Sequence, residues 1–236
     1  MHSAGPSNGF GPIDMPRLAI VAALEREVRP LVKSWRVTEK EHKGRRFRFF
    51  ENGDVVLVCG GIGAEAARRA AEAIIAIADP TVVCSAGFAG ALESGLKVGD
   101  VVRPRTVINA GDASRAIVEG GEGVLVSFAA VASPAQKAKL HESFGAQAVD
   151  MEAASVARSA QARGRQLTVL KAISDEMDFE FFPLDLFVNA DGKFSESRFA
   201  FYTAIRPWLW PRVIRLARNG NRAAHALSMS LRTLSV

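Results

Sequence analysis

The stretch from residue 148 to residue 175 constrains the fold of this chain more than any other. Small apolar residues recur at helical spacing from Ala153 to Ala160, and Gly164 follows as a stop signal. The segment 167–173 is too short and too rich in β-branched residues for a helix, and its single charge is one lysine. We therefore expect a buried strand here. A helix that leads into a buried strand predicts an open α/β sheet, in which ligands bind beyond the carboxyl ends of the strands.

Two carboxylates lie at the ends of these predicted elements. Glu152 stands at the start of the helix, and Asp175 comes just past the carboxyl end of the strand. We expect both to face one small ligand. Each also has a simpler interpretation, since Glu152 would stabilise the helix dipole and Asp175 would be an ordinary acid at a strand end.

The rest of the chain fits a single α/β domain of three layers, α/β/α, with a central mixed sheet. The dipeptide Asn52-Gly53 predicts a hairpin between two antiparallel strands. Glu65 and Arg69 stand four residues apart on the outer face of a helix that Gly63 opens. The expected strands are 18–23, 55–59, 81–85, 100–107 and 124–128, and the expected helices are 63–78 and 133–140.

Length and composition limit the class of protein. With 236 residues, 48% of them hydrophobic, the chain can bury one core, which we assign to residues 15–236. Residues 1–14 are rich in Gly, Pro and Ser and are interpreted as a flexible leader. Cys59 and Cys84 lack a Cys-x-x-Cys or histidine partner set, which argues against a zinc site or a disulfide scaffold. No apolar run reaches the ~18 residues of a membrane span, so we expect a cytoplasmic protein.

The positive charge is concentrated at the carboxyl terminus. The net charge is +5, yet residues 195–236 alone hold seven arginines and one glutamate. This local excess gives no support to nucleic-acid binding by the whole domain. Two interpretations of the tail stay open: a helix packed on the sheet with a solvated basic face, or a surface that meets anionic lipid through Trp208 and Trp210.

Four segments, in their order and spacing, resemble the nucleoside phosphorylase and nucleosidase superfamily, and within it the methylthioadenosine/S-adenosylhomocysteine nucleosidases. They are residues 19–28 (AIVAALEREV), 60–63 (GGIG), 85–92 with 96–100 (SAGFAGAL and LKVGD), and 148–155 with 169–175 (AVDMEAAS and VLKAISD). The resemblance implies a phosphorylase/nucleosidase-like fold. It also implies a homo-oligomer and a small nucleoside substrate, with no metal or organic cofactor.

The resemblance also implies roles for particular residues. Asp175 would be the general acid that protonates the departing purine at N7, and Ser174 would orient it. Glu152 would bind the ribose hydroxyls and Met151 would pack against the sugar. Glu27 matches the glutamate that activates water in the nucleosidases.

Several positions depart from the family pattern. Lys171 stands where the nucleosidases usually carry arginine, and Phe88 replaces a small polar residue near the ribose. Val131 falls where the adenine-stacking aromatic lies. We expect Phe88, Val131 and Lys171 to bind the substrate. The segment between residues 107 and 126 is shorter than in the nucleosidases. In the phosphorylases a phosphate-binding arginine and serine stand where this chain has Ser85 and Phe88. The resemblance therefore implies that the phosphate site has been lost.

We therefore expect hydrolysis of the N-glycosidic bond of a 5′-substituted adenosine, with Asp175 and Glu27 catalytic. Alternatives are a phosphate-dependent phosphorylase and a non-catalytic nucleoside-binding module. A dinucleotide fingerprint starting at Gly61 is disfavoured, because Asp79 precedes Pro80 at a helix end instead of closing a strand. The basic tail and the shortened middle resemble the hopanoid-associated branch, whose proposed role is removing adenine from adenosylhopane, and this implies peripheral membrane contact.

Overall fold

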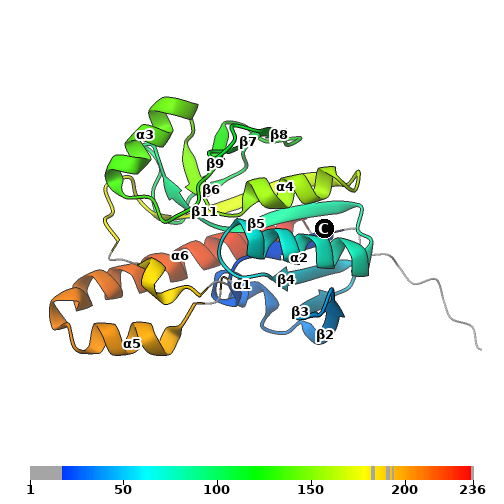
Figure 1. The fold of residues 1–236 in the computed structure, drawn as a ribbon, viewed down its shortest axis with the longest axis horizontal. Coiled ribbons are helices and arrows are strands. Elements are labelled where there is room, and N and C mark those ends of the chain that lie inside the picture. Colours follow the sequence, from blue (N-terminus) through cyan, green and yellow to red (C-terminus); the bar gives the residue numbers. More distant parts are fainter. Residues whose placement is uncertain (1–17, 182–183, 190–191, 193, 235–236) are drawn as a thin grey trace, which may run out of the picture.

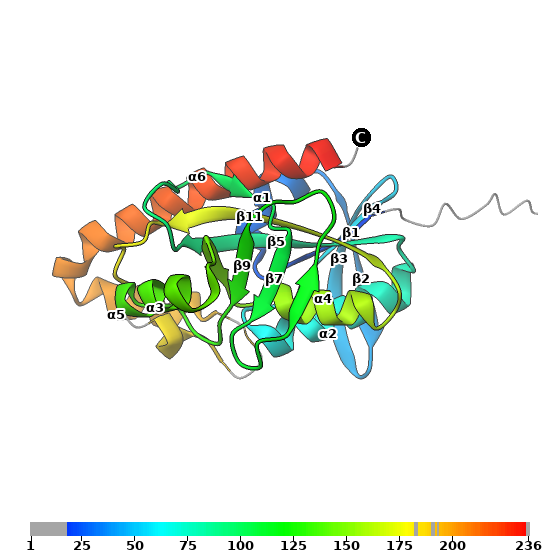
Figure 2. The same cartoon turned by 90° about the horizontal axis from the view of Figure 1, so that it is seen from above.

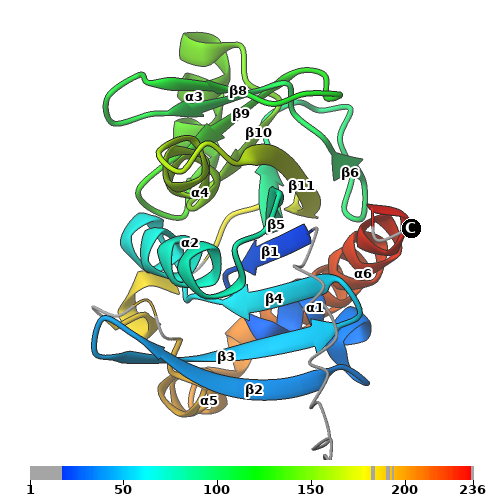
Figure 3. The same ribbon diagram turned by 90° about the vertical axis from the view of Figure 1, so that its right-hand side faces the viewer.

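The computed structural model describes residues 18–181, 184–189, 192 and 194–234. The predicted leader, residues 1–14, lies outside the described residues. A central sheet carries helices on both faces (Figure 1), as predicted. Helices α2 (Ala64–Ala78) and α4 (Ala153–Gln161) cover one face, and α1 (Glu25–Val32) and α6 (Trp210–Leu234) cover the other (Figure 3).

The sheet is mixed and follows the order β2-β3-β4-β1-β5-β10-β9-β7-β8, with β11 beside β5 and β6. The first half contains β2 (Arg36–His42), β3 (Arg45–Asn52), β4 (Val55–Cys59), β1 (Leu18–Ala22) and β5 (Val82–Ala91). The second half contains β10 (Ala148–Asp150), β9 (Val124–Ser127), β7 (Thr106–Asn109) and β8 (Arg115–Ile117), and the side branch is β11 (Gln166–Asp175) and β6 (Val101–Val102).

The long central strand β5 creates an opening in the sheet. One edge of β5 pairs with β11 along nearly its whole length. The other edge pairs in parallel with β1 from Val82 to Ser85 and antiparallel with β10 at Gly90 and Ala91. Between those two partners, residues 86–89 pair on this edge with no strand of the described part of the chain. Because β1 and β10 run toward each other, their carboxyl ends meet at this gap, which is where ligands bind in sheets of this type.

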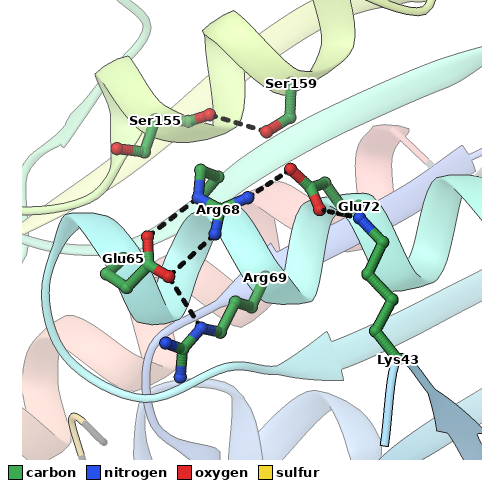
Figure 4. A network of polar contacts seen from close by, with 7 residues as sticks. All are labelled: Lys43, Glu65, Arg68, Arg69, Glu72, Ser155 and Ser159. Carbon is green, nitrogen blue, oxygen red and sulfur yellow. Dashed lines mark hydrogen bonds and ion pairs between the residues drawn. The ribbon is translucent and has the colours of Figure 1, made fainter. Parts of the chain in front are cut away.

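Most local predictions hold. Strands β3 and β4 form the predicted antiparallel hairpin. On α2, Glu65 pairs with Arg69 and Arg68 with Glu72, and Lys43 joins this network from the β2–β3 turn (Figure 4). Three expected strands differ from the structure. The strand 100–107 is divided into β6 and β7, and the strand 81–85 continues as β5 to Ala91. Strand β11 continues to Asp175, which is therefore its last residue.

The remaining helices lie around the opening. Helix α3 (Pro134–Phe144) begins with a capping box between Ser133 and Gln136. Helix α5 (Glu196–Ala204) follows the 3-10 turn η1 (Leu184–Phe187), and a second turn, η2 (Pro207–Leu209), leads into α6. Figures 1 and 2 show α5 and the start of α6 extending beyond the sheet as a projecting pair, which we call the helical tip (residues 196–222).

The two halves of α6 have different environments. In the second half, Ala223, Ala224, Leu227 and Leu231 are buried in the core together with α1 and β11. In the first half no side chain is fully buried, and Ile214 is 50% exposed. The prediction of a helix packed on the sheet is therefore correct for residues 223–234 only.

Candidate active site

A cavity of about 680 Å³ occupies the opening at the middle of β5. Its walls come from the ends of β1, β10 and β11, from the loop before α2, and from the start of α3. Helix α6 and the residues Phe181, Val188, Phe194 and Phe199 close one side. The lining also includes Arg26, Glu27, Gly63, Phe88, Gly90, Val131, Lys137, Asp150, Met151, Glu152, Ser174 and Asp175.

Glu27 enters the cavity from the first turn of α1, directly after β1. Glu27 is only 6% exposed, and its Oε2 has no hydrogen-bond partner among the described residues. Burial, together with the negative charge of Glu152, raises the pKa of Glu27 from 4.5 to about 7. A carboxylate with this pKa can exchange a proton near neutral pH, as a general base must.

A buried ion pair lies behind this wall. The ammonium of Lys171 is 2.8 Å from Oδ2 of Asp150, and both side chains are at most 1% exposed. Ser127 Oγ and the amide of Ala153 also donate to Asp150. Burial alone would lower the pKa of Lys171, but the negative charges of Asp150, Glu152 and Glu27 raise it. The raised pKa keeps the amine of Lys171 protonated, so a positive charge lies among three acids.

The absence of a side chain at Gly87 leaves room for the carboxylate of Glu27 and the ammonium of Lys171. A Cβ at Gly87 would lie 2.9 Å from Oε2 of Glu27 and 3.6 Å from Nζ of Lys171. The first of these separations is too short for a real Cβ contact, so any side chain here would displace the carboxylate of Glu27.

Glu152 is the residue that immediately precedes α4, as predicted. Its Oε1 accepts a hydrogen bond of 2.8 Å from the amide of Gly63, and Oε2 accepts one of 3.3 Å from the amide of Met151. Burial raises the pKa of Glu152. Each carboxylate oxygen has a second lone pair, so both can still accept from a ligand hydroxyl.

Asp175 lies on the other side of the cavity. Ser174 Oγ donates to its Oδ1 over 2.7 Å, and Lys137 Nζ lies 2.5 Å from its Oδ2. Both carboxyl oxygens of Asp175 therefore have a polar partner. Lys137 was not predicted. It shares a helix face with Leu140, and that spacing is the one sequence feature that points to its burial.

Seven of the eight predicted site residues line this cavity: Glu27, Phe88, Val131, Met151, Glu152, Ser174 and Asp175. Lys171, the eighth, lies behind the wall on Asp150 rather than on the cavity surface. Among the described residues, no group of three His, Cys, Asp or Glu side chains is arranged to hold a metal.

An apolar wall extends the cavity toward the helical tip. It combines three phenylalanines and one valine before and on α5 with aliphatic side chains on α6: Phe181, Val188, Phe194, Phe199, Val213, Leu216 and Ala217. The guanidinium of Arg26 stacks over the ring of Phe194, 5.2 Å from its centroid. The sequence alone did not place any of these residues at the site, because they reach it only through the tertiary fold.

Two groups that could bind a phosphate or a dinucleotide, the Ser85 hydroxyl and the amides of the glycine loop, are not available to a ligand in this cavity. Ser85 is fully buried and is not among the residues that line the cavity. The amide of Gly63, at the amino end of α2, is occupied by Glu152. The glycine loop therefore holds an internal carboxylate at the position where a bound phosphate would accept hydrogen bonds.

Comparison with known proteins relates this geometry to one family. The family model described as phosphorylase superfamily matches residues 17–135 and 121–201. A 5′-methylthioadenosine/S-adenosylhomocysteine nucleosidase of Haemophilus influenzae is 38% identical over 90 residues, which are 36% of this chain and 39% of the relative.

Solved structures with lower identity share the fold. A Helicobacter pylori 5′-methylthioadenosine/S-adenosylhomocysteine nucleosidase has a TM-score of 0.70 at 20% identity, over 94% of this chain and 98% of its own. The futalosine hydrolase of Helicobacter pylori has a TM-score of 0.65 at 21% identity, over 92% and 98%. The predicted nucleosidase-like fold is confirmed.

Proposed function

The chain belongs to the phosphorylase superfamily, as its motifs predicted, and from this premise we propose that it hydrolyses the N-glycosidic bond of a 5′-substituted adenosine. One observation carries the proposal: Glu27, Glu152 and Asp175 converge on one cavity from three different elements. Their separate environments suit three separate tasks.

The proposed reaction assigns one task to each acid. Asp175 supplies a proton to the purine as the bond to the sugar breaks. Glu152 accepts hydrogen bonds from the ribose hydroxyls and favours positive charge on the sugar ring. Glu27 takes a proton from the attacking water, for which its unpartnered Oε2 and raised pKa are suited. Lys171 acts behind them by limiting the repulsion between Glu27 and Glu152.

Water is favoured over phosphate as the nucleophile. A bound phosphate dianion needs several cationic donors. Two cations line the cavity among the described residues: Lys137 is paired with Asp175, and Arg26 stacks on Phe194. Within this part of the chain, a phosphorylase reaction would have to rely on Arg26.

The apolar wall supports a large apolar 5′ group on the substrate. Such a group would lie between the aromatic side chains and α6, where it would gain roughly 25 cal/mol per Å² of buried apolar surface. The hopane skeleton of adenosylhopane, implied by the resemblance to the hopanoid-associated branch, has this chemistry.

A series of adenine nucleosides with 5′ groups of increasing apolar size tests this proposal. We expect adenine release to become more efficient, in kcat/KM, as the group grows from hydroxyl to methylthio to longer alkylthio chains. An efficiency that falls steadily along the series would contradict an apolar 5′ subsite.

Replacing Glu152 by Gln should lower kcat/KM for adenine release by roughly 10- to 100-fold, because charge stabilisation of the sugar is lost. A 2′-deoxy substrate should already be poor with the unmutated protein and should lose little further in the variant. Equal rates of the unmutated protein on ribo and deoxyribo substrates would contradict the ribose role of Glu152.

We also propose that the helical tip meets an anionic membrane surface. Large apolar side chains are exposed on it: Phe201 at 69%, Ile205 at 55%, Trp208 at 70%, Trp210 at 52% and Ile214 at 50%. Exposed arginines at 212, 215 and 218 accompany them on α6. Exposed tryptophans beside a basic face are typical of interfacial helices. A second copy of the tip is a poor partner, because the arginines of the two copies would repel each other.

Among the described residues, no helix is long and apolar enough to cross a membrane.

Vesicle sedimentation tests the tip. The protein should sediment with anionic vesicles at low salt, be released at high salt, and stay in solution with neutral vesicles, because each arginine adds about 1 kcal/mol of screened attraction. Replacing Arg212, Arg215 and Arg218 by Gln should abolish sedimentation. A control with the exposed Arg36, Arg105 and Arg115 replaced by Gln loses the same charge elsewhere and should still bind. Failure of the unmutated protein to sediment at low salt would contradict membrane contact.

A homo-oligomer remains a prediction from the family resemblance.

A further inference from the structure

Lys137 occupies a position that is unfavourable for a positive charge. Its side chain is 1% exposed, and that of its partner Asp175 is 6% exposed. It also lies in the first turn of α3, where the helix dipole repels cations. Such a lysine must be held by strong contacts, and two are present: Oδ2 of Asp175 at 2.5 Å and the carbonyl of Glu176 at 2.6 Å.

The surrounding backbone leaves room for this pair. A Cβ at Gly90 would lie 2.7 Å from Oδ2 of Asp175 and 3.1 Å from Cε of Lys137. Both Lys137 and Asp175 line the cavity. An ammonium group has three hydrogens, and the described contacts use two of them.

The geometry points to Lys137 as the source of the proton that the departing base receives, an inference that rests on the proposed hydrolysis. Nζ of Lys137 donates to Oδ2 of Asp175 over 2.5 Å, so a proton can pass directly between the two groups. We propose that the proton moves from Nζ of Lys137 to Oδ2 of Asp175 across their direct contact, and that the carboxyl group passes it to N7 of the purine. Lys137 is then a positioning residue that acts through Asp175.

The step balances in atoms and charge. The C1′–N9 bond breaks and its electron pair goes to the purine, which takes the proton at N7 and leaves as a neutral base. Water forms the new C1′–O bond and gives its proton to Glu27. Lys137 is left as a neutral amine beside a carboxylate. It regains a proton from solvent after the base departs, while Glu27 releases one.

Two substrates separate a proton-supply role from a structural one. Adenine needs a proton to leave, whereas 4-nitrophenolate leaves without one. Lys137→Met should lower adenine release by on the order of 10², the usual contribution of a proton donor. It should change hydrolysis of 4-nitrophenyl β-D-ribofuranoside by less than about 10-fold. Lys137→Arg, which keeps a cation, should retain more adenine release than Lys137→Met.

A second variant covers the case in which Lys137→Met unfolds, since it leaves a buried carboxylate unpaired. Lys137→Met combined with Asp175→Asn removes both charges. It should release adenine no more slowly than Asp175→Asn alone, because Lys137 acts only through Asp175. A further 10-fold loss in the double variant, or equal losses on both substrates in a folded Lys137→Met variant, would overturn the inference. Failure of the unmutated protein to release adenine would instead overturn the proposed function.

Discussion

Replacing Glu27 by Gln should abolish most adenine release and at the same time stabilise the fold. The rate should fall by on the order of 10² or more, because an amide cannot take a proton from water. With the unmutated protein, kcat/KM should rise with pH and level off above about pH 7, since the base must be ionised and the pKa of Glu27 is about 7. Glu27→Gln should lose this rise.

The stability effect follows from the direction of the pKa shift. The carboxyl group titrates at about 7 in the folded chain and at the ordinary 4.5 when unfolded. Between these values the folded state binds more protons, so stability falls as pH rises from 4.5 to 7, and the loss is complete above pH 7. At pH 8 the variant should gain about 3 kcal/mol, which raises Tm by roughly 9 °C. The gain should disappear at pH 4.

Glu25→Gln is the matched control. Glu25 lies two residues away, is exposed and pairs with Arg48, so its replacement should leave both activity and the pH dependence unchanged. Full activity in Glu27→Gln, or a Tm below that of the unmutated protein at pH 8, would remove Glu27 from this account.

Replacing Asp175 by Asn should lower adenine release by on the order of 10² or more while the fold survives. The amide oxygen can still accept from Lys137 and the amide group can still contact N7, but no proton can be delivered. The exposed Asp178, three residues on, gives the control Asp178→Asn, which should be fully active. Thermal melts separate lost chemistry from lost structure, and near-normal turnover in a folded Asp175→Asn variant would contradict the role of Asp175.

The sequence predicted those parts of the site that local motifs carry. Glu152 and Asp175 sit at the ends of elements whose type follows from apolar periodicity, and a sheet brings such ends together. The glycines at 87 and 90 belong to a motif recognised from the sequence. Their physical reason, space for Glu27 and for the Lys137–Asp175 pair, is visible only in three dimensions.

The rest of the site depends on contacts between distant segments. Lys137 reads as a surface residue of a polar helix, because nothing near it in sequence shows that Asp175, 38 residues away, will neutralise it. Lys171 was expected at the ligand, but its partner Asp150 draws it behind the wall. The apolar wall comes from residues before and on α5 and on the first half of α6, and the second half of α6 packs on α1 and β11.

The central claim is that water cleaves the nucleoside, and product analysis with and without phosphate tests it most directly. The full chain should release adenine from 5′-methylthioadenosine at the same rate in phosphate-free buffer and in buffer with inorganic phosphate, with a free reducing sugar as the other product. Release that requires phosphate and yields a sugar 1-phosphate, or no release at all from any adenine nucleoside, would contradict the account.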